Sequence, residues 1–220
     1  MLNSAETTGC ATPMIDLMET GEVLDAAACA ELSSALRQGG GSRATVLGQS
    51  AAASVQPLVR STTRAAVPPA TRERVVRLLH ERKAAIERHF GLALGPCEEP
   101  QFLRYLPGDF FVAHQDGNTP LIFDRTRFRK ISVVIFLSRH SQDPSPDTYG
   151  GGSLVFHGPY PDYELRVPVA PSPGTLVAFR AETTHEVTPV IHGERITIVS
   201  WYPTASEIPA ETAGARAERA

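Results

Sequence analysis

Three side chains in the second half of this 220-residue sequence have the chemistry and order of a metal site. His114 and Asp116 lie two positions apart, and His185 follows far downstream. Two imidazoles and one carboxylate can bind one face of a ferrous ion and leave the other face open. Because residues i and i+2 of a strand point to the same side, His114 and Asp116 can both face a barrel interior. A structural zinc site would instead use four protein ligands, commonly with sulfur among them.

Arg195 follows the second histidine by ten positions and opens the next expected strand. Its planar guanidinium can bind a carboxylate through two parallel hydrogen bonds. If a hairpin joins strands 186–190 and 195–202, Arg195 lies near the level of His185, and Thr197 adds a hydroxyl on the same strand face. Together these groups predict an Fe(II) oxygenase that holds 2-oxoglutarate at both ends. Taken singly, His-x-Asp also fits a hydrogen-bonded surface pair, and Arg195 fits an ordinary edge-strand arginine.

The composition favours a globular domain and argues against several other classes. Hydrophobic residues make up 42% of the chain, which is enough for a core, and the net charge is −3. Because Lys and Arg form no single-sign stripe, we expect no nucleic-acid partner. No apolar stretch is long enough to cross a bilayer, and the polar N-terminus is unlike a secretory signal, so we expect no membrane partner. The three scattered cysteines lack CxxC spacing, and a reducing cytoplasm is the expected location.

Helices are expected before residue 100 and strands after it. Residues 1–20 are expected to be loosely ordered. Asp25 is a candidate N-cap for a first helix that the glycines from Gly39 end, and Pro68-Pro69 introduces a second helix that Gly91 caps. From Gln101 onward, short β-rich runs alternate with turn signals. The expected strands are 102–106, 110–114, 131–137, 153–156, 164–169, 175–179, 186–190 and 195–202.

Eight short strands without intervening helices indicate a double-sheet jelly roll or a similar barrel. With the helices at the front, the fold class is α+β, and the N-terminal helices pack on one sheet. We expect a single domain over residues 1–220. Within it, 1–100 is helical and strand support, 101–203 is the β core, and 204–220 is a C-terminal tail.

Four further sequence runs accompany the histidine, aspartate and arginine pattern. They are RYLPG at 104–108 with HQD at 114–116, YGGGSL at 149–154, PGTLVAF at 173–179, and the closing run from His185 through Arg195 to Trp201-Tyr202. In combination they resemble the prolyl 4-hydroxylase-like branch of the 2-oxoglutarate/Fe(II)-dependent dioxygenases. The resemblance covers roughly residues 100–203, with a weaker match in the leading helices.

The resemblance implies a fold, a set of ligands and a set of cofactors. The fold is a double-stranded β-helix, which is a cupin-like jelly roll. The iron ligands are His114, Asp116 and His185, and Arg195 anchors 2-oxoglutarate, with Tyr105 as a hydrogen-bond donor to the same carboxylate. O2 is the second co-substrate, and ascorbate is a further cofactor that the family allows.

Two residue choices within the family pattern narrow the expected chemistry. Collagen-type members generally have Lys where this chain has Arg195, whereas oxygen-sensing members have Arg. The expected 2-oxoglutarate pocket is therefore more similar to that of the oxygen-sensing members. Related halogenases replace the carboxylate ligand by a small residue, so Asp116 favours hydroxylation. The glycines at 150–152 fit either close approach of a ligand or a tight turn.

We therefore expect a 2-oxoglutarate- and Fe(II)-dependent dioxygenase that hydroxylates an unactivated aliphatic C–H bond. The expected substrate is a small molecule or a peptide: a prolyl residue, an amino acid or an amino-acid-derived natural product. Two other interpretations remain open. A non-catalytic cupin-like protein would bind a metal or ligand without depending on 2-oxoglutarate, and a dioxygenase that works without 2-oxoglutarate would leave Arg195 without a role.

Overall fold

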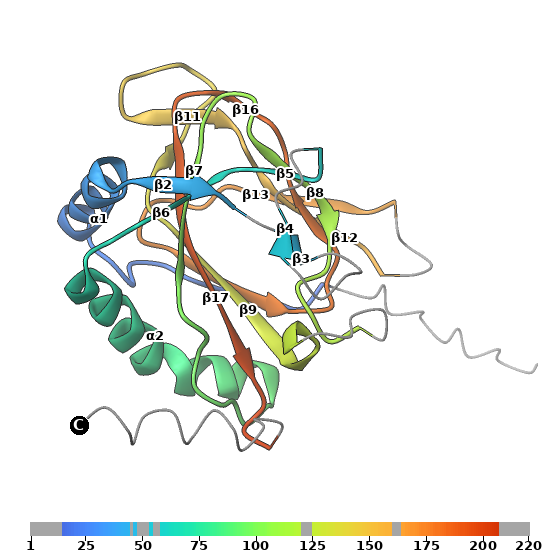
Figure 1. The fold of residues 1–220 in the computed structure, drawn as a ribbon. Helices are drawn as coiled ribbons and strands as arrows, with labels where there is room; N and C mark the ends of the chain where they lie inside the picture. The colour runs from blue at the N-terminus through green and yellow to red at the C-terminus, as the bar shows by residue number, and fades with distance from the viewer. Residues whose placement is uncertain are drawn as a thin grey trace, which may run out of the picture.

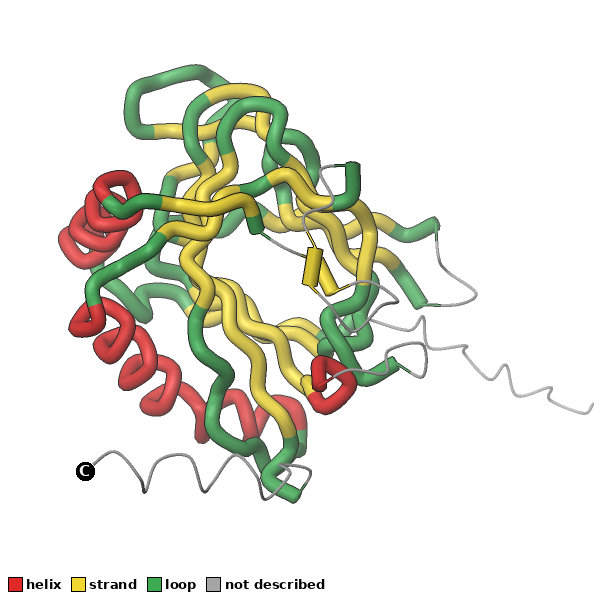
Figure 2. Tube along the Cα trace, in the orientation of Figure 1, coloured by secondary structure: helices red, strands yellow, loops and turns green. Residues whose placement is uncertain are grey.

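The structure, a computed structural model, describes residues 15–44, 46–47, 53–54, 58–119, 125–159 and 164–206. Two α-helices in these ranges, α1 (Ala26–Gln38) and α2 (Pro69–Phe90), precede the main run of strands. Both helices lie along one flank of the strands (Figures 1 and 2). The α+β class expected from the sequence is confirmed.

Both helices begin and end where the local chemistry requires. The Asp25 carboxylate accepts a hydrogen bond from the Ala28 N–H at 2.7 Å, so it caps α1 as expected. Helix α2 starts with Pro69 in its first turn, where no N–H is needed, and ends at Gly91 in the left-handed conformation with φ 66°. No helix among the described residues has the length and apolar composition that crossing a membrane requires.

The larger sheet has seven strands in the order β1-β14-β9-β17-β7-β6-β2. Its neighbouring pairs are antiparallel. The strands are β1 (Leu17–Thr20), β14 (Leu176–Arg180), β9 (Arg129–Phe136), β17 (Arg195–Pro203), β7 (Gln101–Tyr105), β6 (Thr63–Ala65) and β2 (Gly41–Arg43).

The second sheet has five strands in the order β13-β12-β15-β8-β5. Its members are β13 (Arg166–Val169), β12 (Leu154–His157), β15 (His185–Val187), β8 (Phe110–His114) and β5 (Arg60–Ser61). A three-stranded sheet follows the order β10-β11-β16, with β10 (Arg139–His140), β11 (Thr148–Gly151) and β16 (Val190–His192). The remaining elements are the pair β3 (Val46–Leu47) and β4 (Ala53–Ser54) and the 3₁₀ helix η1 (Arg125–Phe128).

Two hydrophobic clusters separate the layers. The first joins the apolar faces of α1 and α2 to one face of the seven-stranded sheet; it includes Leu32, Leu36, Val75, Leu79, Ile86, Ile131, Val133, Ile135, Ile196 and Ile198. The second combines residues of the other face with residues of the five-stranded sheet; it includes Leu103, Tyr105, Val134, Phe136, Leu154, Phe156, Val177, Phe179 and Val187. The helices therefore pack on one sheet, as expected, and the two sheets enclose a separate interior.

Strand alternation decides which side chains enter that interior. On β17, Ile196 and Ile198 belong to the cluster against the helices. Because successive side chains of a strand point to opposite faces, Arg195 and Thr197 point into the space between the sheets. Both are fully buried there, with exposed fractions of 2% and 0%.

Two sequence expectations about the chain's path are wrong. Residues 17–20 are not loosely ordered, because β1 pairs antiparallel with β14 from Leu17↔Phe179 to Thr20↔Leu176. The expected strand 186–190 is divided into β15 and β16, and it forms no hairpin with 195–202. Pro189 lies at the division and has no N–H with which to continue the ladder. Residues 1–14 and the tail from 207 onward lie outside the described residues.

Candidate metal centre

The pairing of β15 with β8 brings the two histidines together. His185 lies directly opposite His114 in this antiparallel ladder, and their ring centroids are 4.2 Å apart. Opposite residues in adjacent strands project on the same side of a sheet. Asp116 lies two residues beyond the end of β8, where its N–H donates to the carbonyl of Ala181 at 2.9 Å. The adjacent Gln115 amide donates to the Glu182 carbonyl at 2.7 Å, which further fixes this turn.

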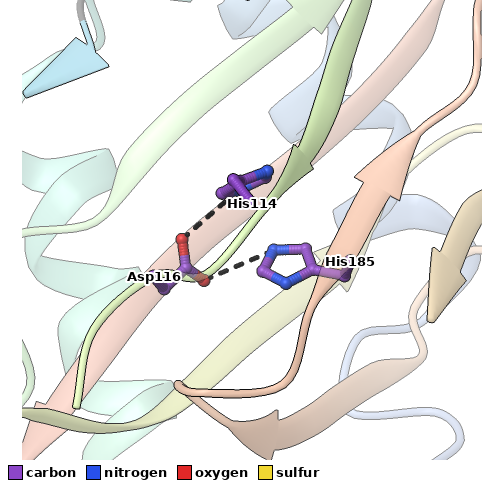
Figure 3. Close-up of side chains that lie close together, drawn as sticks. All are labelled: His114, Asp116 and His185. Carbon is purple, nitrogen blue, oxygen red and sulfur yellow. Dashed lines mark ion pairs between the residues drawn. The ribbon is translucent and has the colours of Figure 1, made fainter. Parts of the chain in front are cut away.

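The ligand atoms of His114, Asp116 and His185 all lie within 4.8 Å of one another. Asp116 Oδ1 is 3.6 Å from His114 Nε2, and Asp116 Oδ2 is 3.5 Å from His185 Nε2. Figure 3 shows the three side chains pointing toward one another, with His114 and Asp116 on one segment, β8 and the turn after it, and His185 on β15. The sequence-predicted triad is thus brought together by one strand pair and the turn that follows it.

Backbone hydrogen bonds orient both imidazole rings. His114 Nδ1 lies 2.8 Å from the Val112 carbonyl, and His185 Nδ1 lies 2.9 Å from the Thr183 carbonyl. A carbonyl oxygen only accepts, so each Nδ1 carries the hydrogen and donates it. In the neutral ring Nε2 then holds a lone pair, and both Nε2 atoms face the Asp116 carboxylate. This is the arrangement in which imidazole binds a metal.

The ionisation states also suit metal binding. Burial and the neighbouring His114 lower the pKa of His185 to about 4, so its ring is neutral at neutral pH. Burial alone would raise the pKa of Asp116, but His185, His114 and Arg129 hold it well below its usual range. At neutral pH the site therefore presents a carboxylate beside a neutral His185 ring, and this pair is not a salt bridge.

Two neighbouring residues hold Asp116 in place, one through its carboxylate and the other through its backbone carbonyl. The Ser132 hydroxyl, on β9, donates to Asp116 Oδ2 at 2.7 Å, and Ser132 is 1% exposed. Arg129 reaches the Asp116 carbonyl at 3.4 Å while it bonds both carboxylate oxygens of Glu98 at 2.7 Å. Its guanidinium also lies 3.7 Å above the ring of Trp201. The Ser132 hydrogen bond restricts rotation of the carboxylate, and the Arg129 contact holds the backbone from which it projects.

Aromatic rings form the walls of the triad. His185 packs against Phe179 at 4.7 Å between centroids, and Phe111 stacks on His114 at 3.6 Å with 17° between the planes. Phe156 meets Phe179 edge-on at 4.8 Å. Apolar walls lower the local dielectric and therefore strengthen the interactions of any ion held between them.

Arg195 is a buried cation in the same interior. Its guanidinium lies 5.0 Å from the centroid of Tyr105, its cross-strand partner, and 5.3 Å from that of Phe136. It donates through Nη1 to the Thr197 hydroxyl at 3.3 Å, whereas its Nε is buried without a hydrogen-bond partner. Tyr105 and Phe136 belong to the cluster between the sheets, together with Phe156 and Phe179 of the triad walls. Arg195, Thr197 and Tyr105 therefore border the interior between the sheets, and Phe156 and Phe179 of the same cluster contact His185.

No carboxylate among the described residues forms an ion pair with Arg195. The adjacent Glu194 is turned away, because its two oxygens bind Arg37 Nε and Arg104 Nε, each at 2.6 Å. A cation–π contact is worth about 0.5–2 kcal/mol, whereas removing an unpaired charge from water costs several kcal/mol. The aromatic faces therefore do not offset the burial of this charge, and a bound carboxylate would.

The residues present fit both a ferrous ion and 2-oxoglutarate. Two imidazole nitrogens and one carboxylate are the ligand set of the two-histidine, one-carboxylate iron sites. The uncompensated guanidinium and the Thr197 hydroxyl offer a carboxylate one charge and two kinds of hydrogen bond. The metal face and Arg195 border one apolar interior. One molecule that carries two carboxylates can therefore bind the metal with one and Arg195 with the other.

Comparison with known proteins agrees with this geometry. Residues 100–203 match the 2OG-Fe(II) oxygenase superfamily. A PKHD-type hydroxylase of Burkholderia ambifaria is 33% identical over 103 residues, which are 46% of this chain and 41% of that protein. A prolyl-4-hydroxylase structure from Pseudomonas putida superposes with a TM-score of 0.64 at 21% identity, and covers 86% of this chain and 93% of its own. HygX of Streptomyces hygroscopicus, with nickel and 2-oxoglutarate bound, gives 0.61 at 14% identity, with coverage of 87% and 84%.

The sequence relatives and the structural matches cover different shares of the proteins compared. The chain spans less than half the length of the curated relative from Burkholderia ambifaria. The structural matches, which cover most of both chains, confirm the expected double-stranded β-helix fold.

Ser132 is a site residue that the sequence analysis missed. It stands between Ile131 and Val133 in an apolar strand, so it was counted only as a strand residue. A single hydroxyl on the inward face of a buried strand was the available signal, since a buried polar group needs a partner.

We predict that Ser132→Ala lowers the affinity for Fe(II), or for Mn(II) in its place, by about 10-fold, because the carboxylate loses an orienting hydrogen bond. Anaerobic calorimetric titration measures this affinity. Ser200→Ala is the matched control, since Ser200 is equally buried but donates to the Glu98 carbonyl at 2.8 Å. Equal affinities for both variants and the unmodified protein would contradict the role given to Ser132.

Proposed function

We propose that the protein is a 2-oxoglutarate- and Fe(II)-dependent dioxygenase of the prolyl 4-hydroxylase-like branch, because residues 100–203 match the 2OG-Fe(II) oxygenase superfamily. The proposed reaction is hydroxylation of an unactivated aliphatic C–H bond. The observation that carries the proposal is a three-ligand metal face and a buried, uncompensated Arg195 bordering one interior.

His114, Asp116 and His185 would hold the iron, and Arg195 with Thr197 would hold the distal carboxylate of 2-oxoglutarate. When bound, Fe(II) with 2-oxoglutarate and O2 supplies the oxidising power that converts C–H to C–OH, with succinate and CO2 as co-products. The chain's contribution is orientation: the Val112 and Thr183 carbonyls fix the rings, and Ser132 fixes the carboxylate.

Besides the hydrogen bond that the family resemblance implies, Tyr105 has a second role in the proposed co-substrate site. It is 2% exposed, lies opposite Arg195 in the β7–β17 ladder, and presents its ring to the guanidinium. The ring holds the guanidinium in place at one face, so its donors remain directed toward a carboxylate. We assign Tyr105 this orienting contact together with the hydrogen bond expected from the family pattern.

For the substrate we propose a prolyl residue in a peptide or protein. The support is the likeness to a prolyl-4-hydroxylase of Pseudomonas putida and to PKHD-type hydroxylases. Asp116 also supports hydroxylation, since an ionised carboxylate occupies the position that a halide would need. A free amino acid and an amino-acid-derived natural product are the competing substrates that the experiment below separates.

We predict that protein loaded anaerobically with Fe(II) and 2-oxoglutarate develops a weak visible charge-transfer band. His114→Ala and Asp116→Ala should abolish it, because each leaves only two protein ligands. His89→Ala is the control, since His89 lies on α2 and contacts Asp16 rather than the triad. A full band in His114→Ala would remove the metal assignment, and tight metal binding without any response to 2-oxoglutarate would favour a non-catalytic cupin-like protein.

We predict that Arg195→Ala weakens 2-oxoglutarate binding by about 2–3 kcal/mol, which is roughly a 30- to 150-fold rise in Kd, because a charge-assisted pair is lost. Arg195→Lys should lose less, since it keeps the charge but not the planar fork. Titration of the charge-transfer band measures both. Unchanged affinity in Arg195→Ala would contradict the anchor assignment.

The substrate proposal predicts that succinate release rises with proline-containing peptides more than with free proline or other amino acids. Mass spectrometry of the peptide should then show the gain of one oxygen atom on proline. Peptides with alanine in place of proline are the control. Release that responds only to free amino acids would move the substrate to the small-molecule class.

A further inference from the structure

Tyr149 is a buried tyrosine whose hydroxyl has no partner. The residue is 0% exposed, and its hydroxyl oxygen is a buried atom without a hydrogen bond. An unsatisfied buried hydroxyl costs about 1–3 kcal/mol, and phenylalanine would fill the same space without that cost. The Arg195 guanidinium lies near the hydroxyl and can only donate a hydrogen bond, so the hydrogen of the phenol lacks an acceptor among the described residues, and a ligand could supply one.

The unpartnered hydroxyl lies beside Arg195. A methyl group placed on Gly152 would be 3.0 Å from Arg195 Cδ and 3.3 Å from Tyr149 Cε2, so the two side chains meet over this glycine. The charge of the Arg195 guanidinium and its approach to the hydroxyl as a hydrogen-bond donor both oppose the rise that burial causes in the pKa of Tyr149. Arg195 Nε is likewise buried without a partner. Two neighbouring unsatisfied groups, one a cation and one a hydroxyl, thus share one location.

A single carboxylate explains both groups. Its two oxygens accept hydrogen bonds and its charge neutralises the guanidinium, whereas a neutral ligand or a water would leave the charge uncompensated. Burial keeps the phenol protonated at neutral pH, so the hydroxyl is available as a donor. Thr197 completes the set from the β17 side, where it already accepts a hydrogen bond from Arg195 at 3.3 Å.

We infer that Tyr149 binds the co-substrate: its hydroxyl donates to the distal carboxylate that Arg195 holds. The inference rests on the proposed function, because it uses the same co-substrate. It assigns the selectivity for a dicarboxylate to Tyr149 on β11 and Arg195 on β17, which belong to different sheets. It also explains why a glycine stands at position 152. With φ at 58° and both side chains close to where a Cβ would stand, Gly152 leaves the room in which the ring of Tyr149 can reach Arg195.

The test is calorimetric titration of Mn(II)-loaded Tyr149→Phe with 2-oxoglutarate and with 2-oxovalerate, in which a methyl group replaces the distal carboxylate. Loss of a hydrogen bond to a charged group should raise the Kd for 2-oxoglutarate by about 10-fold and leave that for 2-oxovalerate unchanged. Tyr202→Phe is the matched control, because Tyr202 is also fully buried but donates to the Leu79 carbonyl beside α2. It should bind both ligands as the unmodified protein does.

Two results would overturn the inference in distinguishable ways. If the unmodified protein binds 2-oxoglutarate tightly and Tyr149→Phe binds it equally well, Tyr149 is not a co-substrate residue and the proposed function stands. The same conclusion follows if Tyr149→Phe weakens both ligands equally, since the ring then acts only through packing. If the unmodified Mn(II)-loaded protein does not bind 2-oxoglutarate, the proposed function fails and this assignment fails with it.

Discussion

The buried positive charge of Arg195 is the constraint on which the interpretation of this molecule depends. The side chain is 2% exposed, its aromatic contacts are too weak to offset its desolvation, and the neighbouring Glu194 is held by Arg37 and Arg104. A fold that places a cation between two sheets without a counter-charge is most stable when an anion is bound. That requirement links the arginine to a carboxylate ligand, and the apolar interior shared with His185 links the ligand to the metal face.

The metal face itself follows from a short piece of β geometry. Antiparallel pairing sets His185 opposite His114, and backbone carbonyls two residues before each ring hold the hydrogens on Nδ1. The direction of each Nε2 lone pair is thereby decided before any metal binds. Asp116 needs more support because it lies beyond the end of β8, and it receives that support from Ser132 and Arg129. The triad is therefore preorganised, which limits the entropy lost on metal binding.

The residue types and order of His114, Asp116 and His185 were enough to predict that these three side chains meet, because few other chemistries need that combination. The helix bounds were predictable from Asp25, Pro69 and Gly91, each of which acts through local backbone chemistry. The path of the chain between His185 and Arg195 was not predictable from the sequence. The placement of β15 and β17 in different sheets depends on long-range contacts and on Pro189. Ser132 and Tyr149 escaped prediction for a related reason. A serine or tyrosine in an apolar strand is informative only once its buried neighbours are known.

The most direct measurement is a crystal structure of the protein grown without oxygen in the presence of Mn(II) and 2-oxoglutarate. We predict that the ion lies within bonding distance of the Nε2 atoms of His114 and His185 and of an Asp116 oxygen. We also predict that the distal carboxylate of 2-oxoglutarate is bound to the guanidinium of Arg195. An ion bound elsewhere, or a co-substrate whose distal carboxylate contacts solvent while Arg195 stays unpaired, would contradict these predictions.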